Sequence, residues 1–441
     1  MRPDDVILGA GMTGIAVAWS SGLAVYEAEA RPGGICRSYH LRPGLKTPLA
    51  DPSEDGESYR FEIGGGHWIF GGDPLVLRFM NRFASMKRYQ RRAVVHFPDS
   101  GLTVPYPLQY HLHHLGRDAA ERALGEMRKA PDTPPRLLSA WLEQSFGPTL
   151  TSLFFGPFHE AYTAGLWTEI APQDGLKSPV NLAMAAQGAT GGVQTAGYNS
   201  SFLYPEQGLA GFAESMASSS LIHYQKMVTS IDLSTRVLQF QDGASVRFNT
   251  LISTLPLHRM LDLCRLTVDE PPDPHTSVLV LNIGAIRGAC CPDSHWVYVP
   301  RSRSRFHRIG FYSNVETSFL PSRSEGRVSI YVERAFRAGS RPSLEEIAAY
   351  SNAVIEELQD WGFIGPVEVL DPSWVEVAYT WRRPESRWRE KALQVLSSFD
   401  VVMVGRYGAW QFQGIADSIR DGLMAGACLR RDAAGSLSNG G

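Results

Sequence analysis

The stretch VILGAGMTGIAVAW near the start of the chain constrains the fold more than any other feature. It predicts a short apolar strand, a glycine turn and an apolar helix. Gly9, Gly11 and Gly14 then allow a tight turn, close approach of the backbone to a pyrophosphate, and close helix–strand packing. LAVYEAE follows as a second strand, and Glu27 at its end can hold a ribose hydroxyl. The sequence therefore predicts a Rossmann-like dinucleotide-binding unit.

A second glycine pair supports the same interpretation. In RPGGICRSY, Gly33 and Gly34 lie beside Arg37, as expected where the backbone approaches a large cofactor closely. The C-terminal segment VVMVGRYGAWQFQGIADSIRDGLMAGACL predicts another strand, glycine turn and helix. Its helix provides a second N-terminus for the cofactor. Distant parts of the chain are thus expected to build one cofactor site.

Between these segments the pattern changes twice. Helical stretches such as PLVLRFMNRFASM and PPRLLSAWLEQSFG are interrupted by the extended LTVPYPLQY, and a later run of closely spaced strands predicts a mixed, largely antiparallel sheet. We predict an α/β fold with a Rossmann-like domain, an inserted helical domain and this sheet domain. The predicted boundaries are 1–75, 195–270 and 396–432 for the cofactor domain, 76–194 for the helical domain, 271–395 for the sheet domain and 433–441 for a disordered tail.

Composition excludes several classes of partner. The 441 residues carry a formal net charge of -3, so there is no sequence-wide basic field for nucleic acid or an anionic membrane. The five cysteines include no CxxC pair, which argues against a disulfide framework and favours a reducing cytoplasm. No apolar run approaches the roughly 18 residues of a membrane span, and no charged-then-apolar leader opens the chain. Any anion must therefore be bound at a local site.

Histidines suggest two possible sites. His67 follows three glycines and precedes an aromatic run in FEIGGGHWIFGGD, where it is either a cofactor-side group or a loop residue without a chemical part. HLHHL contains His111, His113 and His114, but no cysteine or acidic ligand set accompanies them at a usable spacing. We therefore predict no metal site.

The motifs GAGMTG, GGICR, FEIGGGHWIF, TVPYPLQ, SSFLYPEQGLAG, ISTLPL and VGRYGAWQF, in that order, carry a family resemblance. Over nearly the whole chain they resemble the flavin-dependent UDP-galactopyranose mutases, particularly the eukaryotic type, within the FAD amine oxidase-like superfamily. The glycine motifs are shared with amine oxidases, protoporphyrinogen oxidases and desaturases and identify only the cofactor. GGHWIF, VPYPLQ and GRYGAWQF distinguish the mutases from these other enzymes, as does the WVYVP strand that precedes Arg308 in RFHRIGFYSN.

The resemblance implies FAD as cofactor, active in its reduced form. It also implies an NDP-hexose mutase that interconverts pyranose and furanose rings without net redox change. In such enzymes N5 of the reduced flavin attacks the anomeric carbon, expels the nucleoside diphosphate and forms a covalent flavin–sugar adduct. The sugar ring opens and recloses in that adduct, so the expected substrate is a GDP- or UDP-galactose-like nucleotide sugar.

Roles for individual residues follow from the same resemblance. Arg308 and Arg406 resemble the pair that clamps the pyrophosphate, because guanidinium groups bind phosphate oxygens bidentately, and His67 resembles a residue at the flavin N5 edge. The implied cofactor-binding residues are Gly9, Gly11, Gly14, Glu27, Gly33, Gly34, Arg37, Gly66, His67, Val228, Gly405, Ile415, Ala416 and Ser418. The implied substrate-binding residues are Tyr106, Gln109, Phe154, His159, Asn199, Trp296, Tyr298, Arg308, Tyr379, Arg406 and Phe412.

Several positions depart from the family pattern. Phe412 stands where a phosphate-binding tyrosine is common, and a GYP-type tyrosine is absent around RRPESRW, although Tyr379 is close. The family's mobile-loop arginine would fall near GLKSP, where Lys177 is the only cation in reach. His159 replaces an asparagine that reads uracil, and Leu108 replaces an aromatic residue. These changes put uridine in doubt more than the reaction class, so a GDP-hexose is a serious alternative.

Two other functions stay open. An FAD-dependent oxidase or desaturase of the same superfamily would have nearly identical cofactor motifs, but an aromatic cage and a lysine-bound water would face its flavin. A non-catalytic flavin-binding protein is the third class, favoured by the altered tyrosine positions. A homodimer is compatible with the sequence, which does not fix the oligomeric state.

Overall fold

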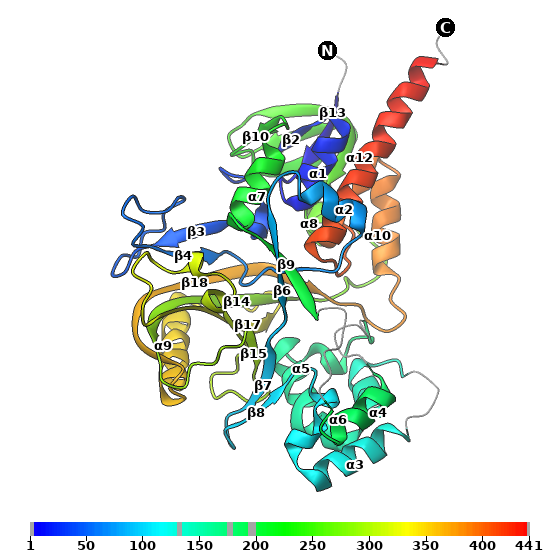
Figure 1. Cartoon of the computed structure of the whole chain (residues 1–441). Helices are drawn as coiled ribbons and strands as arrows, with labels where there is room; N and C mark the ends of the chain where they lie inside the picture. Colours follow the sequence, from blue (N-terminus) through cyan, green and yellow to red (C-terminus); the bar gives the residue numbers. More distant parts are fainter. Residues whose placement is uncertain (1–3, 130–134, 174–179, 193–199, 439–441) are drawn as a thin grey trace.

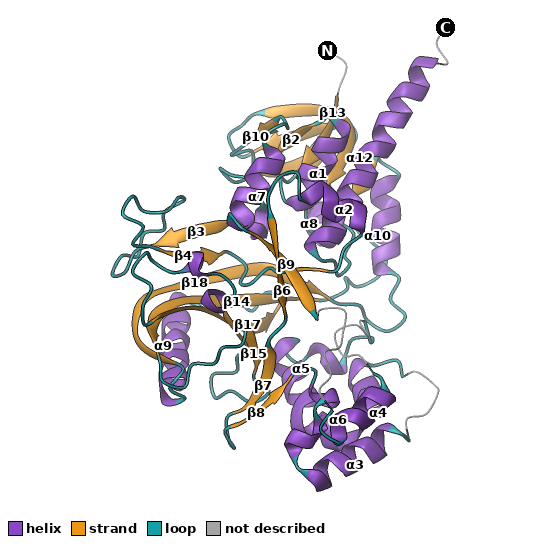
Figure 2. Cartoon of the chain, viewed as in Figure 1, coloured by secondary structure: helices purple, strands orange, loops and turns teal. Residues whose placement is uncertain are grey.

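The computed structural model describes residues 4–129, 135–173, 180–192 and 200–438. Figure 1 shows a helix-flanked sheet near the two termini, a large curved sheet in the middle and a helical lobe at the opposite end. Figure 2 shows the same arrangement by secondary structure, with helices gathered around the terminal sheet and in the lobe. The predicted α/β class, with an inserted helical region and a mixed, largely antiparallel sheet, is confirmed.

The sheet near the termini gathers strands from distant parts of the chain. Its order is β10-β2-β1-β13-β12-β11, and β19 pairs with β13. β1 pairs in parallel with both β2 and β13, while β12 pairs antiparallel with β11 and β13. The strands are β1 (Asp4–Leu8), β2 (Ala24–Tyr26), β10 (Ile222–His223), β11 (Val228–Asp232), β12 (Val237–Phe240), β13 (Ser245–Ser253) and β19 (Val401–Met403).

Helices surround this sheet and bring the chain ends together. α1 and α12 pack closely at Gly422 of α12. A Cβ built on this glycine would lie only 2.4 Å from the carbonyl oxygen of Thr13, so the absence of a side chain permits the contact. The C-terminal helix therefore lies directly against the first glycine turn (Figure 1). The helices are α1 (Met12–Ser21), α2 (Pro74–Met80), α7 (Gly208–Ala217), α8 (Leu257–Cys264), α10 (Trp388–Ser397), α11 (Gly405–Gly408) and α12 (Ile415–Ser438).

The last element of the chain is α12, which the structure describes as far as Ser438. Part of the predicted tail at 433–441 lies outside the described residues, and this boundary stays a prediction.

The large sheet has the order β18-β14-β17-β16-β15-β7-β8. Neighbouring strands are antiparallel except β15 and β7, which are parallel. α9 covers one face through buried Val354 and Leu358. The strands and helix are β7 (Ala93–Phe97), β8 (Leu102–Pro105), β14 (His275–Arg287), β15 (Trp296–Tyr298), β16 (Arg308–Phe311), β17 (Arg327–Arg337), α9 (Leu344–Asp360) and β18 (Ile364–Thr380).

Two small sheets lie between the terminal sheet and the large sheet. β3 pairs with β4, and β9 pairs with both β5 and β6, all antiparallel. The elements are β3 (Ser38–Leu41), β4 (Tyr59–Glu62), β5 (Ile69–Phe70), β6 (Met86–Gln90) and β9 (Ser201–Pro205), with short 3-10 turns η1 (Gly34–Cys36), η6 (Tyr312–Asn314) and η7 (Thr317–Phe319). They connect the glycine loops to the large sheet.

The helical lobe has its own apolar core, which includes Leu142, Phe146 and Phe155. The chain enters it from β7 and β8, which belong to the large sheet although they lie within the range expected to be helical. The elements of the lobe are η2 (Leu108–Tyr110), η3 (Leu112–Leu115), α3 (Arg117–Met127), α4 (Leu138–Leu150), the π-helical turn η4 (Thr151–Phe155), α5 (Gly156–Tyr162), η5 (Leu166–Thr168) and α6 (Leu182–Ala189).

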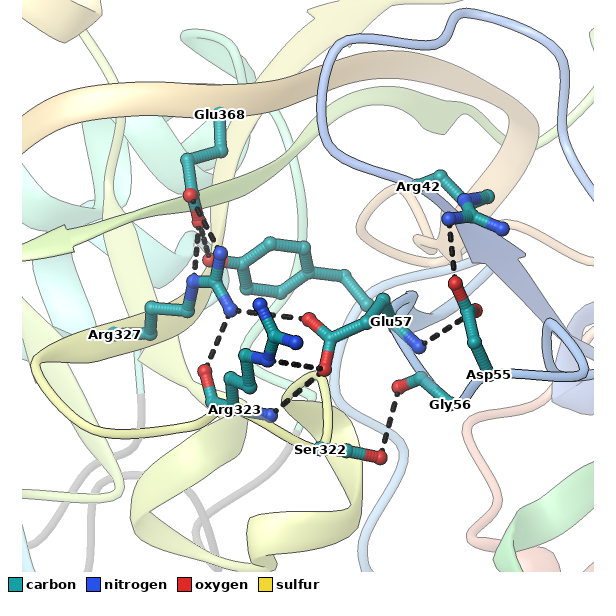
Figure 3. Close-up of polar contacts among 9 residues, drawn as sticks. Arg42, Asp55, Gly56, Glu57, Ser322, Arg323, Arg327 and Glu368 are labelled. Atoms are coloured by element: carbon teal, nitrogen blue, oxygen red, sulfur yellow. Dashed lines mark hydrogen bonds and ion pairs between the residues drawn. The ribbon is translucent and has the colours of Figure 1, made fainter.

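An ion-pair network ties the long connection between β3 and β4 to the large sheet (Figure 3). Nε of Arg327 lies 2.8 Å from Oε2 of Glu368, and its Nη2 donates to Oε1 at 2.9 Å. Its Nη1 donates to the carbonyl oxygen of Arg323 at 2.6 Å and to Glu57 at 3.4 Å. The hydroxyl of Tyr59 also donates to Glu368, at 2.5 Å. All three guanidinium nitrogens of Arg327 therefore have protein acceptors.

Candidate active site

The first glycine turn has the geometry of a phosphate-binding loop. A Cβ on Gly14 would lie 1.9 Å from the carbonyl oxygen of Gly9, so a larger residue cannot pack there. A Cβ on Gly11 would meet no atom within 4 Å, and no side chain caps the start of α1. Amides at an uncapped helix N-terminus bind phosphate groups well. The backbone at Gly11 can therefore be approached closely by a pyrophosphate.

The second glycine pair lies against the first turn. The amide of Gly33 donates to the carbonyl oxygen of Ala10 at 2.7 Å. A Cβ on Gly34 would lie 3.3 Å from the Cα of Gly11. Arg37 turns back onto the loop, with Nε donating to the carbonyl oxygen of Gly34 at 3.1 Å. The two motifs thus form one surface.

Glu27 braces this surface from the end of β2. Its carboxylate accepts the amides of Ala10 at 2.5 Å and Glu29 at 2.9 Å. Each carboxylate oxygen can accept a further hydrogen bond, so a ribose hydroxyl is compatible with this arrangement. The amide of Lys226 donates to the carbonyl oxygen of Glu27 at 2.7 Å, which brings β11 and Val228 to the same end of the sheet.

The C-terminal motif closes the other side of the first turn. A Cβ on Gly405 would lie 2.4 Å from Oγ1 of Thr13, so this glycine permits direct contact with the first turn of α1. The predicted residues at the start of α12 are all buried; they are Ile415, Ala416 and Ser418. Three distant parts of the chain therefore meet at the N-terminus of α1.

The glycine loop before His67 packs on two side chains of β17. A Cβ on Gly66 would lie 2.4 Å from the hydroxyl oxygen of Tyr331. Gly65 has a φ of +80°, and its Cβ would lie 2.8 Å from Oε1 of Glu333. The run of glycines thus lets the loop lie directly over Tyr331 and Glu333, with His67 at its end.

His67 is neutral at pH 7. Burial lowers its pKa to about 4; the carbonyl of Gly65 opposes the shift, and the charges of Arg406 and Arg308 reinforce it. Nδ1 lies 3.0 Å from the carbonyl oxygen of Gly65 and must donate, because a carbonyl only accepts. Nε2 of the neutral ring is therefore a hydrogen-bond acceptor.

Arg308 is held by a buried carboxylate. Its Nε and Nη2 donate to Glu333 at 2.8 Å and 2.6 Å, and the side chain of Glu333 is 3% exposed. Burial disfavours both charges, but their attraction prevails: the pKa of Glu333 falls to about 2 and that of Arg308 rises well above its usual value. Within the described residues Nη1 of Arg308 has no acceptor. That donor remains for an anion.

Arg406, on α11, is held by backbone carbonyls and aromatic rings. Its Nη1 donates to Gln413 at 3.1 Å and its Nη2 to Ala378 at 2.8 Å. Nε is buried without a partner in the described part of the chain. The guanidinium lies 4.7 Å from the ring centre of Phe412 and 5.5 Å from that of Tyr379.

Tyr379 connects the two arginines. Burial raises its pKa, and the positive charges of both Arg308 and Arg406 oppose that shift. Its ring meets that of Tyr162, on α5, edge-on at 4.8 Å. The structure therefore brings both predicted arginines to one tyrosine beside the helical lobe, and the charges of the same two arginines reach His67.

Aromatic rings extend the site into the lobe. Tyr298, directly opposite Arg308 in the sheet, contacts Tyr106 at 4.6 Å and Phe158 at 5.3 Å between ring centres. Phe158 stacks on Phe154, which is 1% exposed and belongs to the lobe core. The side chains of Gln109 and Leu108 are fully buried nearby on η2.

His159 and Trp296 are more buried than substrate contacts usually are. Nδ1 of His159 donates to the carbonyl oxygen of Phe155 at 2.7 Å, because that oxygen can only accept. Trp296 is 2% exposed and packs between Phe70 and Phe202. Their contacts to substrate stay predictions.

Two residues named from the sequence, Asn199 and Lys177, lie outside the described residues. In residues 4–129, 135–173, 180–192 and 200–438, no group of His, Cys, Asp and Glu side chains could hold a metal ion. Nδ1 of His113 lies 2.9 Å from the carbonyl oxygen of Gly188.

Among the residues that the structure describes, no helix is long and apolar enough to cross a membrane.

Sequence reasoning missed several residues of the site, namely Phe158, Tyr162, His307, Tyr331 and Glu333. Tyr331 and Glu333 alternate in the apolar strand RVSIYVERAF and so share one face. A charged residue at an inward position of such a strand is a detectable signal, because burying it requires a partner. No comparable local signal marks the others.

Comparisons with known proteins identify the family. The sequence profile described as "Flavin containing amine oxidoreductase" matches residues 22–279, more than half of the chain. The chain belongs to the flavin-containing amine oxidoreductase family. No curated protein sequence matches it. Its cofactor is FAD, and the glycine turns, Glu27 and α12 described above fit that group.

Solved structures show that this family member has a widely used fold. A reduced UDP-galactopyranose mutase is 22% identical, with a TM-score of 0.83 over 98% of this chain and 94% of that chain. A proposed protoporphyrinogen oxidase from Exiguobacterium sp. 255-15 is 14% identical, with a TM-score of 0.70 over 98% and 99%. A putrescine oxidase bound to putrescine is 15% identical, with a TM-score of 0.58 over 98% and 99%. These identities establish the fold alone.

Proposed function

We propose that this family member is a flavin-dependent NDP-hexose mutase, which interconverts the pyranose and furanose forms of a nucleotide-activated sugar. The observation that carries the proposal is the pair of arginines near the His67 loop, each with a donor left over in the described residues. A dianionic diphosphate suits two such guanidinium groups. The full-length similarity to a UDP-galactopyranose mutase supports it.

The protein's own part in the reaction is binding and orientation. FAD, once reduced, supplies a nucleophilic N5 for exchange with the diphosphate leaving group. Arg308 and Arg406 bind the diphosphate, both in the substrate and after it leaves, so the sugar stays beside the cofactor. His67 presents a neutral acceptor nitrogen, which suits a donor such as the N5–H of reduced flavin.

A guanine nucleotide is the favoured substrate, with UDP-galactose as the alternative. Nδ1 of His159 donates to the carbonyl oxygen of Phe155, and in the neutral tautomer of such a ring Nε2 accepts, which suits an N–H or amino group on a base. Guanine carries such donors on its Watson–Crick edge. Either base could stack on Phe158 and form a hydrogen bond with Gln109, so the preference for guanine is modest.

Anaerobic incubation of the reduced holoprotein with UDP-galactose or GDP-galactose, followed by separation of the products, tests the reaction. We expect a furanose product without stoichiometric loss of reductant, and no product from the oxidised protein. FAD should be released by acid or heat, because no covalent tether is expected. Comparative titrations of GDP and UDP test the base, and UDP binding at least about tenfold tighter would contradict the guanine preference.

An oxidase or desaturase is the second candidate, favoured by the family match and by the fold shared with putrescine oxidase. Such an enzyme would consume an electron acceptor in proportion to product. Equimolar hydrogen peroxide during turnover would therefore support this second candidate over the mutase.

A further inference from the structure

The imidazole of His307, the residue before β16, is buried beside a carboxylate. Its side chain is 1% exposed, and among the described residues neither ring nitrogen makes a well-aligned hydrogen bond. Nε2 lies 3.4 Å from Oε2 of Glu333, the carboxylate that holds Arg308. A buried polar group whose hydrogen bonds are not fully made costs about 1–3 kcal/mol, so a stronger contact with Glu333 would stabilise this position.

The groups around His307 come from three elements. Glu333 faces it from β17, Arg308 adjoins it on β16, and Tyr162 meets its ring edge-on at 5.3 Å from α5. Phe158 of α5 lies at 6.1 Å. Burial lowers the pKa of His307, while Glu333 opposes the shift, so the imidazole is neutral at pH 7. The residue thus joins the helical lobe to the diphosphate-binding arginine.

The charges around Glu333 do not suit a dianion while His307 is neutral. Arg308 and Glu333 then cancel one another, and the carboxylate also repels an approaching diphosphate. A proton on His307 would neutralise Glu333 instead and leave a net positive charge on the three side chains. The ion-pair distance to Glu333 is already present, so no rearrangement of the fold is needed.

We propose that His307 is a positioning residue that takes up one proton from solvent when a nucleotide sugar binds, balancing Glu333 so that Arg308 carries its full charge toward the diphosphate. This inference rests on the proposed function. Because binding favours protonated His307, affinity rises as pH falls and declines as pH rises through the pKa of His307 in the complex. The diphosphate of a nucleotide sugar is a diester without a proton that titrates near neutral pH, so it adds no pH dependence of its own.

Calorimetric titration of oxidised holoprotein with UDP-galactose and with GDP-galactose tests the proposal without turnover. At about pH 7, titrations in two buffers of different ionisation enthalpy report the number of protons taken up. We expect net uptake in the wild type and an affinity gain of up to about tenfold per unit of pH lowered between about pH 8 and 6.

Two variants and a control locate the proton. His307→Gln and Glu333→Gln should each abolish uptake and flatten the pH dependence, and either variant decides if the other does not fold. His96→Gln is the matched control: His96 is a buried histidine of the same sheet, with a lowered pKa, that packs against Trp361 and Phe363 instead. That variant should keep uptake and pH dependence.

The outcomes separate this inference from the function on which it rests. Binding of either nucleotide sugar to the wild type without proton uptake would overturn the role of His307 alone, as would uptake that persists in both glutamine variants. Failure of both sugars to bind the wild type would overturn the proposed function and this inference with it.

Discussion

Two arginine–glutamate pairs lie on the large sheet, and they differ in the hydrogen-bond donors that each arginine leaves over and in the burial of the glutamate. Arg327 of β17 pairs with Glu368 of β18, on the far side of β14, and Arg308 of β16 pairs with Glu333 of the neighbouring β17. Both contacts use Nε and Nη2, and the two arginine side chains are similarly exposed, 18% and 22%. The exposure of the arginine side chain and the nitrogens that contact the glutamate therefore do not distinguish the two pairs.

The two pairs differ in the guanidinium donors that remain without an acceptor. Nη1 of Arg327 is taken by Glu57 and a carbonyl oxygen (Figure 3), whereas Nη1 of Arg308 has no acceptor in the described residues. Glu333 is also more deeply buried than Glu368, with 3% against 20% exposure. A fully satisfied arginine is a structural element, and a firmly held arginine with one free donor is suited to bind an anion.

Arg327→Met should have the largest effect, and on stability alone. Removal of one partner from a largely buried ion pair leaves Glu368 without a counter-charge and Glu57 with Arg323 alone, and we expect a loss of about 3 kcal/mol. The thermal midpoint of the holoprotein should fall clearly, while calorimetric affinity for a nucleotide sugar stays within about twofold. A large loss of affinity with unchanged stability would remove the distinction between the two arginines.

Arg308→Lys should weaken binding while it changes stability less than Arg327→Met does. A lysine keeps a charge for Glu333 but cannot hold that carboxylate with two nitrogens and still offer a third. Loss of one charge-assisted contact corresponds to about 1.5–3 kcal/mol, or about tenfold to a hundredfold in affinity. Calorimetry with UDP and GDP measures it, and an unchanged flavin absorbance spectrum shows that the cofactor site is intact. Unchanged affinity for both nucleotides would exclude Arg308 from the site.

Phe412→Tyr should have a smaller effect of the opposite sign. Phe412 lies over Arg406, where the resembled mutases commonly carry a tyrosine, and a hydroxyl there could reach the diphosphate. One added hydrogen bond is worth about 0.5–1.5 kcal/mol, so nucleotide-sugar affinity should rise about twofold to tenfold. Phe399→Tyr, another exposed phenylalanine, serves as the control and should change nothing. Equal affinities in all three proteins would place the diphosphate away from Phe412.

His67 should give the smallest effect. Burial and the nearby charges of Arg406 and Arg308 hold its pKa at about 4, so it stays neutral above about pH 5. The flavin absorbance of the wild type should therefore show no step between about pH 5.5 and 8 that His67→Gln removes. Because the pKa of His67 is lower in the folded state, its contribution makes the protein less stable as pH falls from 6.5 toward about 4. A flavin transition near neutral pH that His67→Gln abolishes would contradict the assignment.

The sequence by itself determined the cofactor half of the protein. Gly9, Gly11 and Gly14 act through the shape of a few neighbouring residues, and the structure brings them together with Gly33 and Glu27 as expected. Such local motifs can be read because backbone conformation depends on residues adjacent in sequence. The α/β class and the FAD cofactor followed from the same signals and from a resemblance that spans the chain.

Tertiary structure decided which arginine has a donor to spare. The sequence motif points to Arg308 as a phosphate-binding residue, but only the strand register that sets it opposite Glu333 shows how its guanidinium is held. His307 and Tyr162 join the site in the same way, through contacts between residues far apart in the chain. Hydrogen-bond saturation depends on every neighbour in space, and a linear pattern cannot count those neighbours.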